Sequence, residues 1–422
     1  MKEILPSGRS TKVTYAIRDI VVKAQALEQQ GKRVLYLNIG DPPVYDFDTP
    51  QHIKEFLKKK IDEDASDAHH KVSRYADSMG LKSARDAIAA HLRRERGLAV
   101  STDDIAVTAG ASEGIMLAIA ALVNPGENLL VPCPGYPLYD STLALYHGEP
   151  NYYALDEQND WQVDFKDLER KIDAKTRGIV VINPNNPTGA VYTEETLRKI
   201  LAFAKKHELV VFADEIYDQL LIDKEYKHHG LAALAADVPV LAFGGLSKNY
   251  VMPGYRVGWL HFHDPTKKMP KLIGAIKQLL RSRLSAPHLQ QHAVSAALNG
   301  DHAFQKEFLL RLKAKRDVTV EKLNAIPGIS VVPPRGAFYA FARVQLPPGQ
   351  TDKAFVEQLL EEEHVVVVYG SGFGLQEYEE HGVRYGHFRV VFLAKPDTLA
   401  HAYDKIAAFT KRYYEKHHYT PK

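Results

Sequence analysis

The sequence has a single cysteine, no long apolar run and little net charge, and each of these features argues against a class of protein. Cys133 is the only cysteine among 422 residues, so no intrachain disulfide can form, as is usual in a reducing compartment. No apolar run approaches the ~20 residues of a membrane helix, and the first ten residues lack a signal-peptide core. The formal charge of +2 gives no reason to expect nucleic acid or an acidic surface as partner. We therefore expect a cytoplasmic protein.

The composition is that of an ordinary globular protein, with 45% hydrophobic and 25% charged residues. At roughly 100 to 200 residues per domain, the length suggests two or three domains. From about residue 101 to 258, short apolar runs alternate with helical patterns, which is typical of an α/β domain with a mostly parallel sheet. The segments expected to form its strands are 105–108, 129–131, 179–182, 210–212 and 240–243.

The C-terminal part has a different pattern, typical of a smaller α+β domain. After Pro287 a helical stretch runs to about residue 324, interrupted near 299–301. The strand-like segments that follow are 329–332, 338–342, 365–369 and 388–392. The predicted division has three parts: an N-terminal arm with part of the small domain, a large cofactor-binding domain, and the rest of the small domain, at 1–47, 48–300 and 301–422.

Polar residues follow four of the apolar runs, and ligands of α/β sheets bind beyond the carboxyl ends of strands. Residues 108–114 open a helix, where free backbone N–H groups can hold a phosphate. Polar segments also lie at 183–189 and 214–217, and Lys248 follows the run at 240–243, with Arg256 eight residues on. A lysine can form an imine with an aldehyde, an aspartate can stabilise a protonated ring nitrogen, and an arginine can bind a phosphate. Together these groups describe a site for pyridoxal 5'-phosphate.

Three stretches resemble the class I/II aminotransferases, which have the aspartate-aminotransferase fold, fold type I of the pyridoxal-phosphate enzymes. They are Asn-Asn-Pro-Thr-Gly at 185–189, Asp-Glu-Ile-Tyr at 214–217 and the segment 247–258. The resemblance extends from about Tyr15 to Arg389. Within the family, the segments 14–18 and 37–42 are most similar to the alanine (glutamate–pyruvate) aminotransferases of bacteria and archaea.

The resemblance implies a role for each residue around the cofactor. Lys248 would hold it as a Schiff base and then move a proton between the substrate Cα and the cofactor. Asp214 would keep the ring nitrogen protonated, which makes the ring an electron sink. Asn186 and Tyr217 would bind the phenolic oxygen, and Tyr136 would stack on the ring.

It also implies how the phosphate and the substrate are bound. The residues expected at the phosphate are Ala111, Ser112, Ser247, Arg256 and, from a neighbouring subunit, Tyr75. Arg389 would bind the substrate α-carboxylate, assisted by Gly40 and Asn186. Arg18, with Tyr15 beside it, would bind the distal carboxylate of glutamate.

The predicted reaction is transamination between amino acids and 2-oxo acids, alanine and pyruvate with glutamate and 2-oxoglutarate, in a homodimer with shared active sites. Another fold-type-I activity remains open, such as a C–S β-lyase or an aminotransferase for aspartate, valine or LL-diaminopimelate. A non-enzymatic regulator is disfavoured because the segment before Tyr15 is too short for a DNA-binding module. A Rossmann protein is disfavoured because residues 110–114 are not G-x-G-x-x-G.

Structural roles compete with several of these assignments. Asp214 could cap a following helix, and Tyr136 and Tyr217 could be core aromatics. Arg389 lies in an apolar strand, where its guanidinium must meet an anion, so a structural ion pair is its alternative. The histidines come partly as adjacent pairs, which do not share a helix face, so we expect no metal site. The segment 65–72, just before Tyr75, looks longer than in the family.

Overall fold

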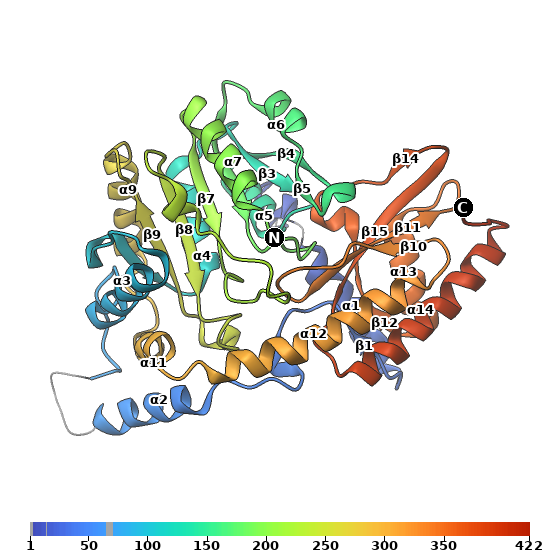
Figure 1. Cartoon of the computed structure of the whole chain (residues 1–422), viewed down its shortest axis with the longest axis horizontal. Helices are drawn as coiled ribbons and strands as arrows, with labels where there is room; N and C mark the ends of the chain where they lie inside the picture. The colour runs from blue at the N-terminus through green and yellow to red at the C-terminus, as the bar shows by residue number, and fades with distance from the viewer. Residues whose placement is uncertain (1–2, 14, 65–70) are drawn as a thin grey trace.

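The structure, a computed structural model, describes residues 3–13, 15–64 and 71–422, and it contains two main sheets side by side (Figure 1). The larger sheet has eight strands, and its order separates β2 from β3 and places β2 beside β9. In that order the strands are β2 (Ile105–Thr108), β9 (Gly258–His263), β8 (Val240–Gly245), β7 (Val210–Asp214), β6 (Thr176–Ile182), β3 (Asn128–Cys133), β4 (Glu149–Asp156) and β5 (Gln162–Val163).

The centre of this sheet is parallel, as predicted. Strands β8, β7, β6, β3 and β4 run parallel to one another, whereas β9 is antiparallel to β8 and β2, and β5 is antiparallel to β4. Its central residues are buried on both faces, which explains why the segment 179–182 is a continuous apolar run. Parallel strands end at the same edge, so the segments that follow them are brought together there.

Helices cover both faces of the large sheet (Figure 1). One face packs against α4 (Ala111–Leu122), α5 (Leu138–Leu145) and α9 (Pro270–Ser282). The other packs against α6 (Phe165–Lys171), α7 (Glu194–Lys206) and α8 (Leu231–Leu234). The end formed by β2 and β9 is covered by α2 (Gln51–Asp64), α3 (Lys82–Arg96) and α11 (Ala293–Asn299).

The smaller sheet carries the C-terminal part of the chain. Its strands are β10 (Ile329–Val331), β11 (Tyr339–Leu346), β15 (Val383–Val391) and β13 (Val368–Tyr369), with β14 (Tyr378–Glu380) paired to β15. A separate two-stranded sheet joins β1 (Leu35–Tyr36) to β12 (Val365–Val366). The single strand predicted at 365–369 is therefore wrong, because its first half pairs with β1 and its second half with β15.

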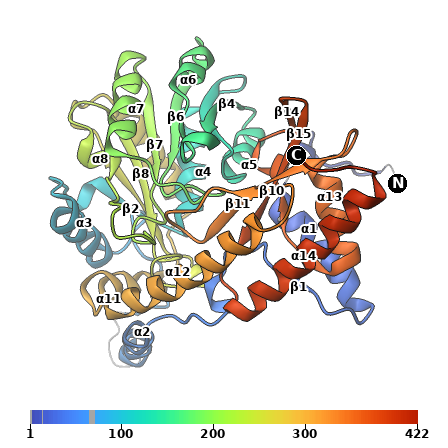
Figure 2. The same cartoon turned by 45° about the vertical axis from the view of Figure 1, so that its right-hand side comes forward.

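Long helices connect and cover this second unit. The helical stretch predicted after Pro287 is present as α10 (His288–Gln291), α11 and α12 (Ala303–Asn324), with a break at 300–302. Figure 2 shows α12 running from the large sheet toward the small one. The remaining helices are α1 (Ala16–Gln29), α13 (Asp352–Glu363) and α14 (Pro396–Lys416). The pairing of β1 with β12 joins the N-terminal segment to the C-terminal part of the chain, as expected if both belong to the small domain. The domain boundaries at residues 47/48 and 300/301 remain a proposal.

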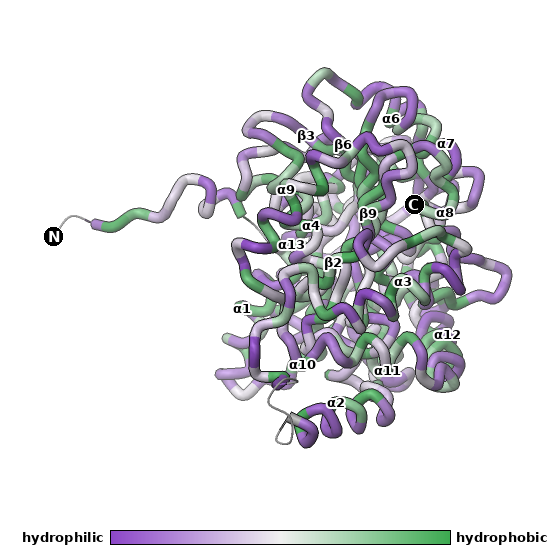
Figure 3. Tube along the Cα trace, turned by 90° about the vertical axis from the view of Figure 1, so that its left-hand side faces the viewer, coloured by the Kyte–Doolittle hydropathy of each residue, from purple (hydrophilic) through white to green (hydrophobic). Residues whose placement is uncertain are grey.

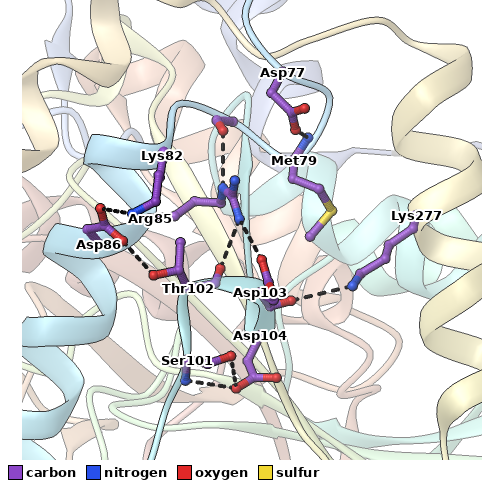
Figure 4. A network of polar contacts seen from close by, with 11 residues as sticks. Asp77, Met79, Lys82, Arg85, Asp86, Ser101, Thr102, Asp103, Asp104 and Lys277 are labelled. Carbon is purple, nitrogen blue, oxygen red and sulfur yellow. Dashed lines mark hydrogen bonds and ion pairs between the residues drawn. The ribbon is translucent and has the colours of Figure 1, made fainter.

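A polar network holds α3 against the segment that enters β2 (Figure 4). Arg85 Nε donates to the Gly80 carbonyl at 3.1 Å, and its Nη1 donates to the Thr102 carbonyl at 3.1 Å. The backbone N–H of Ser101 donates to the Asp104 carboxylate at 2.8 Å, which closes a capping box before the strand. The network fixes the start of β2, whose far end leads into the predicted phosphate-binding segment.

Hydrophobic and hydrophilic residues alternate along the trace (Figure 3), and few large hydrophobic side chains of the described residues are exposed. Residues 3–13 extend from the body and expose Ile4 and Leu5. In the part of the chain that is described, no helix is long and apolar enough to cross a membrane. Most of the segment 65–72, including His69 and His70, lies outside the described residues.

Candidate active site

A cavity of about 450 Å³ lies at the carboxyl ends of the parallel strands and is closed by residues of the N-terminal segment, β11 and β15. Of the residues predicted at the site, all except Tyr75 line this cavity. They are Tyr15, Arg18, Gly40, Ala111, Ser112, Tyr136, Asn186, Asp214, Tyr217, Ser247, Lys248, Arg256 and Arg389. Tyr15 and Arg389, which are 374 positions apart in the sequence, thus line the same cavity.

Lys248 follows β8, and its amine points into the cavity. Its Nζ donates a hydrogen bond to the Gly40 carbonyl at 2.7 Å and lies 5.6 Å from the centroid of the Phe338 ring. Burial, together with the Arg389 and Arg256 guanidinium groups, lowers the pKa of Lys248 to about 8, although the Asp41 carboxylate opposes this. At neutral pH a fraction of the amine is therefore unprotonated, which is the form that attacks an aldehyde.

Asp214 ends β7 at the floor of the cavity. Its side chain is 3% exposed, and Tyr139 Oη donates to its Oδ2 at 3.3 Å, whereas its Oδ1 has no hydrogen-bond partner among the described residues. Burial raises the pKa of Asp214 to about 6. The helix-cap alternative is wrong, because the chain forms turns after Asp214 and the next helix, α8, begins only at Leu231.

The N-terminus of α4 and Arg256 form one corner of the cavity. Gly110 precedes the helix with a φ of 79°, and a Cβ at this position would collide with the Arg256 guanidinium. Arg256 Nη2 donates to the Ala109 carbonyl at 3.2 Å, which holds the guanidinium beside the helix terminus. Free N–H groups, a positive helix end and a cation at one point favour a bound dianion.

Arg389 lies on β15, across the cavity from the large sheet. It is 1% exposed, and its Nη1 donates to Asn186 Oδ1 at 2.8 Å, while its Nη2 donates to the Asn38 carbonyl. Its Nε has no partner, and no carboxylate within residues 3–13, 15–64 and 71–422 forms an ion pair with it. The alternative of a structural ion pair is therefore wrong for the described chain, and the buried guanidinium has room for an anion.

Tyr15 and Arg18 line the opening of the cavity. Tyr15 Oη donates to Tyr136 Oη at 2.9 Å, and the two rings meet edge to face. Arg18 is exposed at the start of α1, and its side chain forms no ion pair or hydrogen bond with another described residue. Tyr75 is 75% exposed and lies outside the cavity of its own chain.

Sequence reasoning missed a buried ion-pair network behind the site. Arg96, at the end of α3, bonds the carboxylates of Glu215 and Asp218, which flank the site residue Tyr217 in the segment after β7. Asn249 Nδ2 donates to Asp218 Oδ1 at 2.6 Å, so the residue next to Lys248 joins the same network. No sequence signal could have revealed it, because Arg96 is an ordinary basic residue at the end of a helix.

Tyr339 was also missed, although it lines the cavity at the start of β11. The sequence analysis assigned the segment 338–342 only as a strand. The one available signal was the aromatic pair Phe338–Tyr339 directly after the Pro/Gly turn at 333–336. Both side chains are buried, and Tyr339 Oη lies 2.8 Å from Tyr217 Oη.

The groups in the cavity fit pyridoxal 5'-phosphate. Lys248 offers a partly deprotonated amine for an aldehyde, and the unpartnered Oδ1 of Asp214 can accept from a ring N–H. The corner at Gly110 and Arg256 suits the phosphate dianion. No cluster of histidine, cysteine and carboxylate side chains able to hold a metal ion occurs in the described part of the chain.

Comparison with known proteins gives a consistent result. The family model "Aminotransferase class I and II" matches residues 32–406. The chain is 38% identical over 421 residues to glutamate–pyruvate aminotransferase AlaA of Escherichia coli K12, covering 98% of this chain and all of that protein. It is 33% identical to mouse tyrosine aminotransferase over 97% of this chain and 88% of that protein. The solved structure of an alanine aminotransferase from Pyrococcus furiosus superposes with a TM-score of 0.90 at 42% identity, over 97% and 100% of the two chains.

Proposed function

The chain belongs to the class I and II aminotransferases, and we propose that it exchanges amino groups between alanine and pyruvate on one side and glutamate and 2-oxoglutarate on the other. It is a pyridoxal-phosphate-dependent enzyme with the aspartate-aminotransferase fold. Relatives over 30% identical include both alanine and tyrosine aminotransferases, so the family alone does not determine the substrates, and we propose them.

The buried guanidinium of Arg389 is the main support for amino-acid and 2-oxo-acid substrates. A buried guanidinium without an anion would be costly, and here the missing anion is the α-carboxylate that every amino acid and 2-oxo acid substrate shares. Asn186 orients the guanidinium from the large sheet, and the Gly40 backbone lies beside the same volume. A planar fork binds a carboxylate through two parallel hydrogen bonds, which sets the direction of the substrate Cα.

The other residues act on the cofactor and on the substrate proton. When bound, pyridoxal phosphate supplies an aldehyde that receives the amino group and a ring that accepts electrons. Asp214 would keep a proton on the ring nitrogen, and Asn186 and Tyr217 would bind the phenolic oxygen. The Lys248 amine, in its unprotonated form, would take the proton from the substrate Cα and hold it for its return.

The remaining cofactor contacts hold the phosphate and the ring. Tyr136 would pack against the ring face. The residues that would hold the phosphate all line the cavity: Ala111, Ser112, Ser247 and Arg256. These phosphate contacts would keep the cofactor bound while its amino group is exchanged with successive substrates, as transamination requires.

A homodimer with shared sites is part of the same proposal, as is a cytoplasmic location. Tyr75 is exposed and does not line its own cavity, as expected for a residue that completes the phosphate site of a neighbouring subunit.

Arg18 is the candidate for distinguishing glutamate from alanine. The same pocket must accept a side chain ending in a carboxylate and one ending in a methyl group, so its cation should be able to move aside. Arg18 meets this requirement because it is exposed at the cavity opening and bonds no other described side chain. The neighbouring Tyr15 donates its hydroxyl hydrogen to Tyr136, so its oxygen can assist as an acceptor for the Arg18 guanidinium.

The test compares Arg18→Ala with Arg33→Ala, an exposed arginine outside the cavity. A charge-assisted hydrogen bond contributes ~1.5–3 kcal/mol, so Arg18→Ala should lower kcat/KM for glutamate and 2-oxoglutarate by about tenfold to a hundredfold. Alanine and pyruvate should stay within about threefold, as should all substrates with Arg33→Ala. Equal losses for both pairs would assign Arg18 a structural role. Release of ammonia and pyruvate without an oxo-acid acceptor would identify a lyase instead.

A further inference from the structure

Tyr339 contacts three parts of the site at once. It is 2% exposed, and it lies at the start of β11, between the segment after β7 and strand β15. Its ring faces the guanidinium of Arg389, and its hydroxyl meets that of Tyr217. A Cβ at Gly40 would collide with the Tyr339 hydroxyl, so the loop that accepts a hydrogen bond from Lys248 rests directly on this side chain.

The ring of Tyr339 holds Arg389 from one side. The guanidinium carbon lies 4.6 Å from the centroid of Tyr339 and 4.8 Å from that of Phe373, so the cation is contacted by two aromatic rings. Its Nη1 and Nη2 are bonded to Asn186 and to the Asn38 carbonyl. Ring contacts of this kind restrict a guanidinium without using the hydrogen-bonding edge that a carboxylate needs.

The hydroxyl of Tyr339 is placed to control the proton of Tyr217. The two oxygens are 2.8 Å apart, and Tyr217 is also buried. Only one hydrogen atom can lie between them. If Tyr339 donates it, the Tyr217 oxygen is satisfied as an acceptor and its own hydrogen stays free for a ligand in the cavity.

We propose that Tyr339 is a positioning residue that links the two ends of the active site: its ring fixes Arg389 for the substrate carboxylate, and its hydroxyl donates to Tyr217 so that Tyr217 donates to the cofactor's phenolic oxygen. This inference rests on the proposed function, because it assigns the carboxylate to Arg389 and the phenolic oxygen to Tyr217. The two roles use different atoms of one side chain and can therefore be separated by substitution.

Two variants separate the roles in the cofactor-loaded enzyme. Tyr339→Phe keeps the ring and loses the hydroxyl, whereas Tyr339→Leu loses both. Tyr403→Phe is the matched control, since this buried tyrosine bonds Thr319 away from the cavity. The first measurement is the pH titration of the imine absorbance. The second is the dissociation constant of propionate, a carboxylate that cannot react, at a pH above every imine pKa.

Tyr339→Phe should raise the proton affinity of the imine by about 1.5- to 4-fold, because Tyr217 keeps its bond to the phenolic oxygen but loses the donor that strengthens this bond by roughly 10–30%. Its propionate affinity should stay within about twofold of wild type. Tyr339→Leu should show the same imine shift and bind propionate about threefold to thirtyfold more weakly, as expected for a lost cation–π contact. Tyr403→Phe should change neither measurement.

Other results overturn the inference. An unshifted imine in Tyr339→Phe removes the hydroxyl role, and wild-type propionate binding in Tyr339→Leu removes the ring role. A shift of both quantities in Tyr339→Phe shows that the two roles are not separate. Failure of the proposed function is recognised separately, because the wild-type protein would then not exchange amino groups between alanine or glutamate and pyruvate or 2-oxoglutarate. The imine titration and the propionate affinity need no turnover, so they test Tyr339 whichever substrates the enzyme uses.

Discussion

Replacing Asp214 with asparagine should stabilise the cofactor-free protein while abolishing its chemistry. The carboxylate is 3% exposed, and one of its oxygens has no partner among the described residues. Burial raises its pKa from 3.8 to about 6. In the cofactor-free protein the positive ring nitrogen that we propose as its partner is missing. The negative charge of the buried Asp214 carboxylate therefore lowers the free energy of unfolding.

The size of the effect follows from this pKa. A rise of about 2 units at 1.36 kcal/mol per unit corresponds to ~3 kcal/mol. Because the folded-state pKa lies above the unfolded one, the carboxyl destabilises the fold fully above about pH 6 and not at all below about pH 4. Asparagine has nearly the same shape, keeps an acceptor for the Tyr139 hydroxyl and does not titrate. The free energy of unfolding should therefore rise by up to ~3 kcal/mol at pH 8, and the gain should vanish toward pH 4.

The assay is denaturant unfolding of cofactor-free protein at several pH values and one fixed protein concentration. Asp404→Asn is the control, because Asp404 is a surface residue paired with Lys322 and should show no such pH-dependent gain. A gain that is equal at pH 4 and pH 8, or a loss at pH 8, would refute the reasoning. With cofactor, Asp214→Asn should lose turnover by orders of magnitude, since a neutral ring nitrogen is a poor electron sink. A near wild-type rate would exclude Asp214 from the cofactor role.

Three further predictions test other parts of the site. Borohydride reduction should remove the imine absorbance and label Lys248, while Lys315, a buried lysine paired with Asp46, stays unmodified; label on another lysine would contradict the assignment. Arg389→Lys keeps the charge but loses the fork, so KM for amino and oxo substrates should rise about tenfold to a hundredfold with a smaller change in kcat, and an unchanged KM would remove it from the carboxylate site. Sedimentation should give a dimer, and Tyr75→Ala should weaken cofactor binding about tenfold; a fully active monomer would refute the shared site.

Local sequence patterns predicted much of the large sheet. The strand expected at 105–108 has the same bounds in the structure, and the runs at 179–182 and 210–212 lie within β6 and β7. They were recognisable because strands buried on both faces must be continuously apolar. Strands β4 and β9 were not predicted, since their mixed sequences give no clear run. The split at 365–369 was equally invisible, because it depends on which distant strand each half meets.

For the active site, the sequence by itself determined the chemical groups and their order. Asp214 ends β7, and Lys248 follows β8 with Arg256 eight residues on. Parallel strands end at one edge, so local patterning was enough to bring these groups together. Only the tertiary structure decided what faces them. Arg389 has no carboxylate partner among the described residues, and Tyr339 reaches Tyr217, because strands β11 and β15 pack across the cavity from the large sheet. Such contacts join residues more than a hundred positions apart, and their geometry depends on how whole sheets pack rather than on any neighbouring residue.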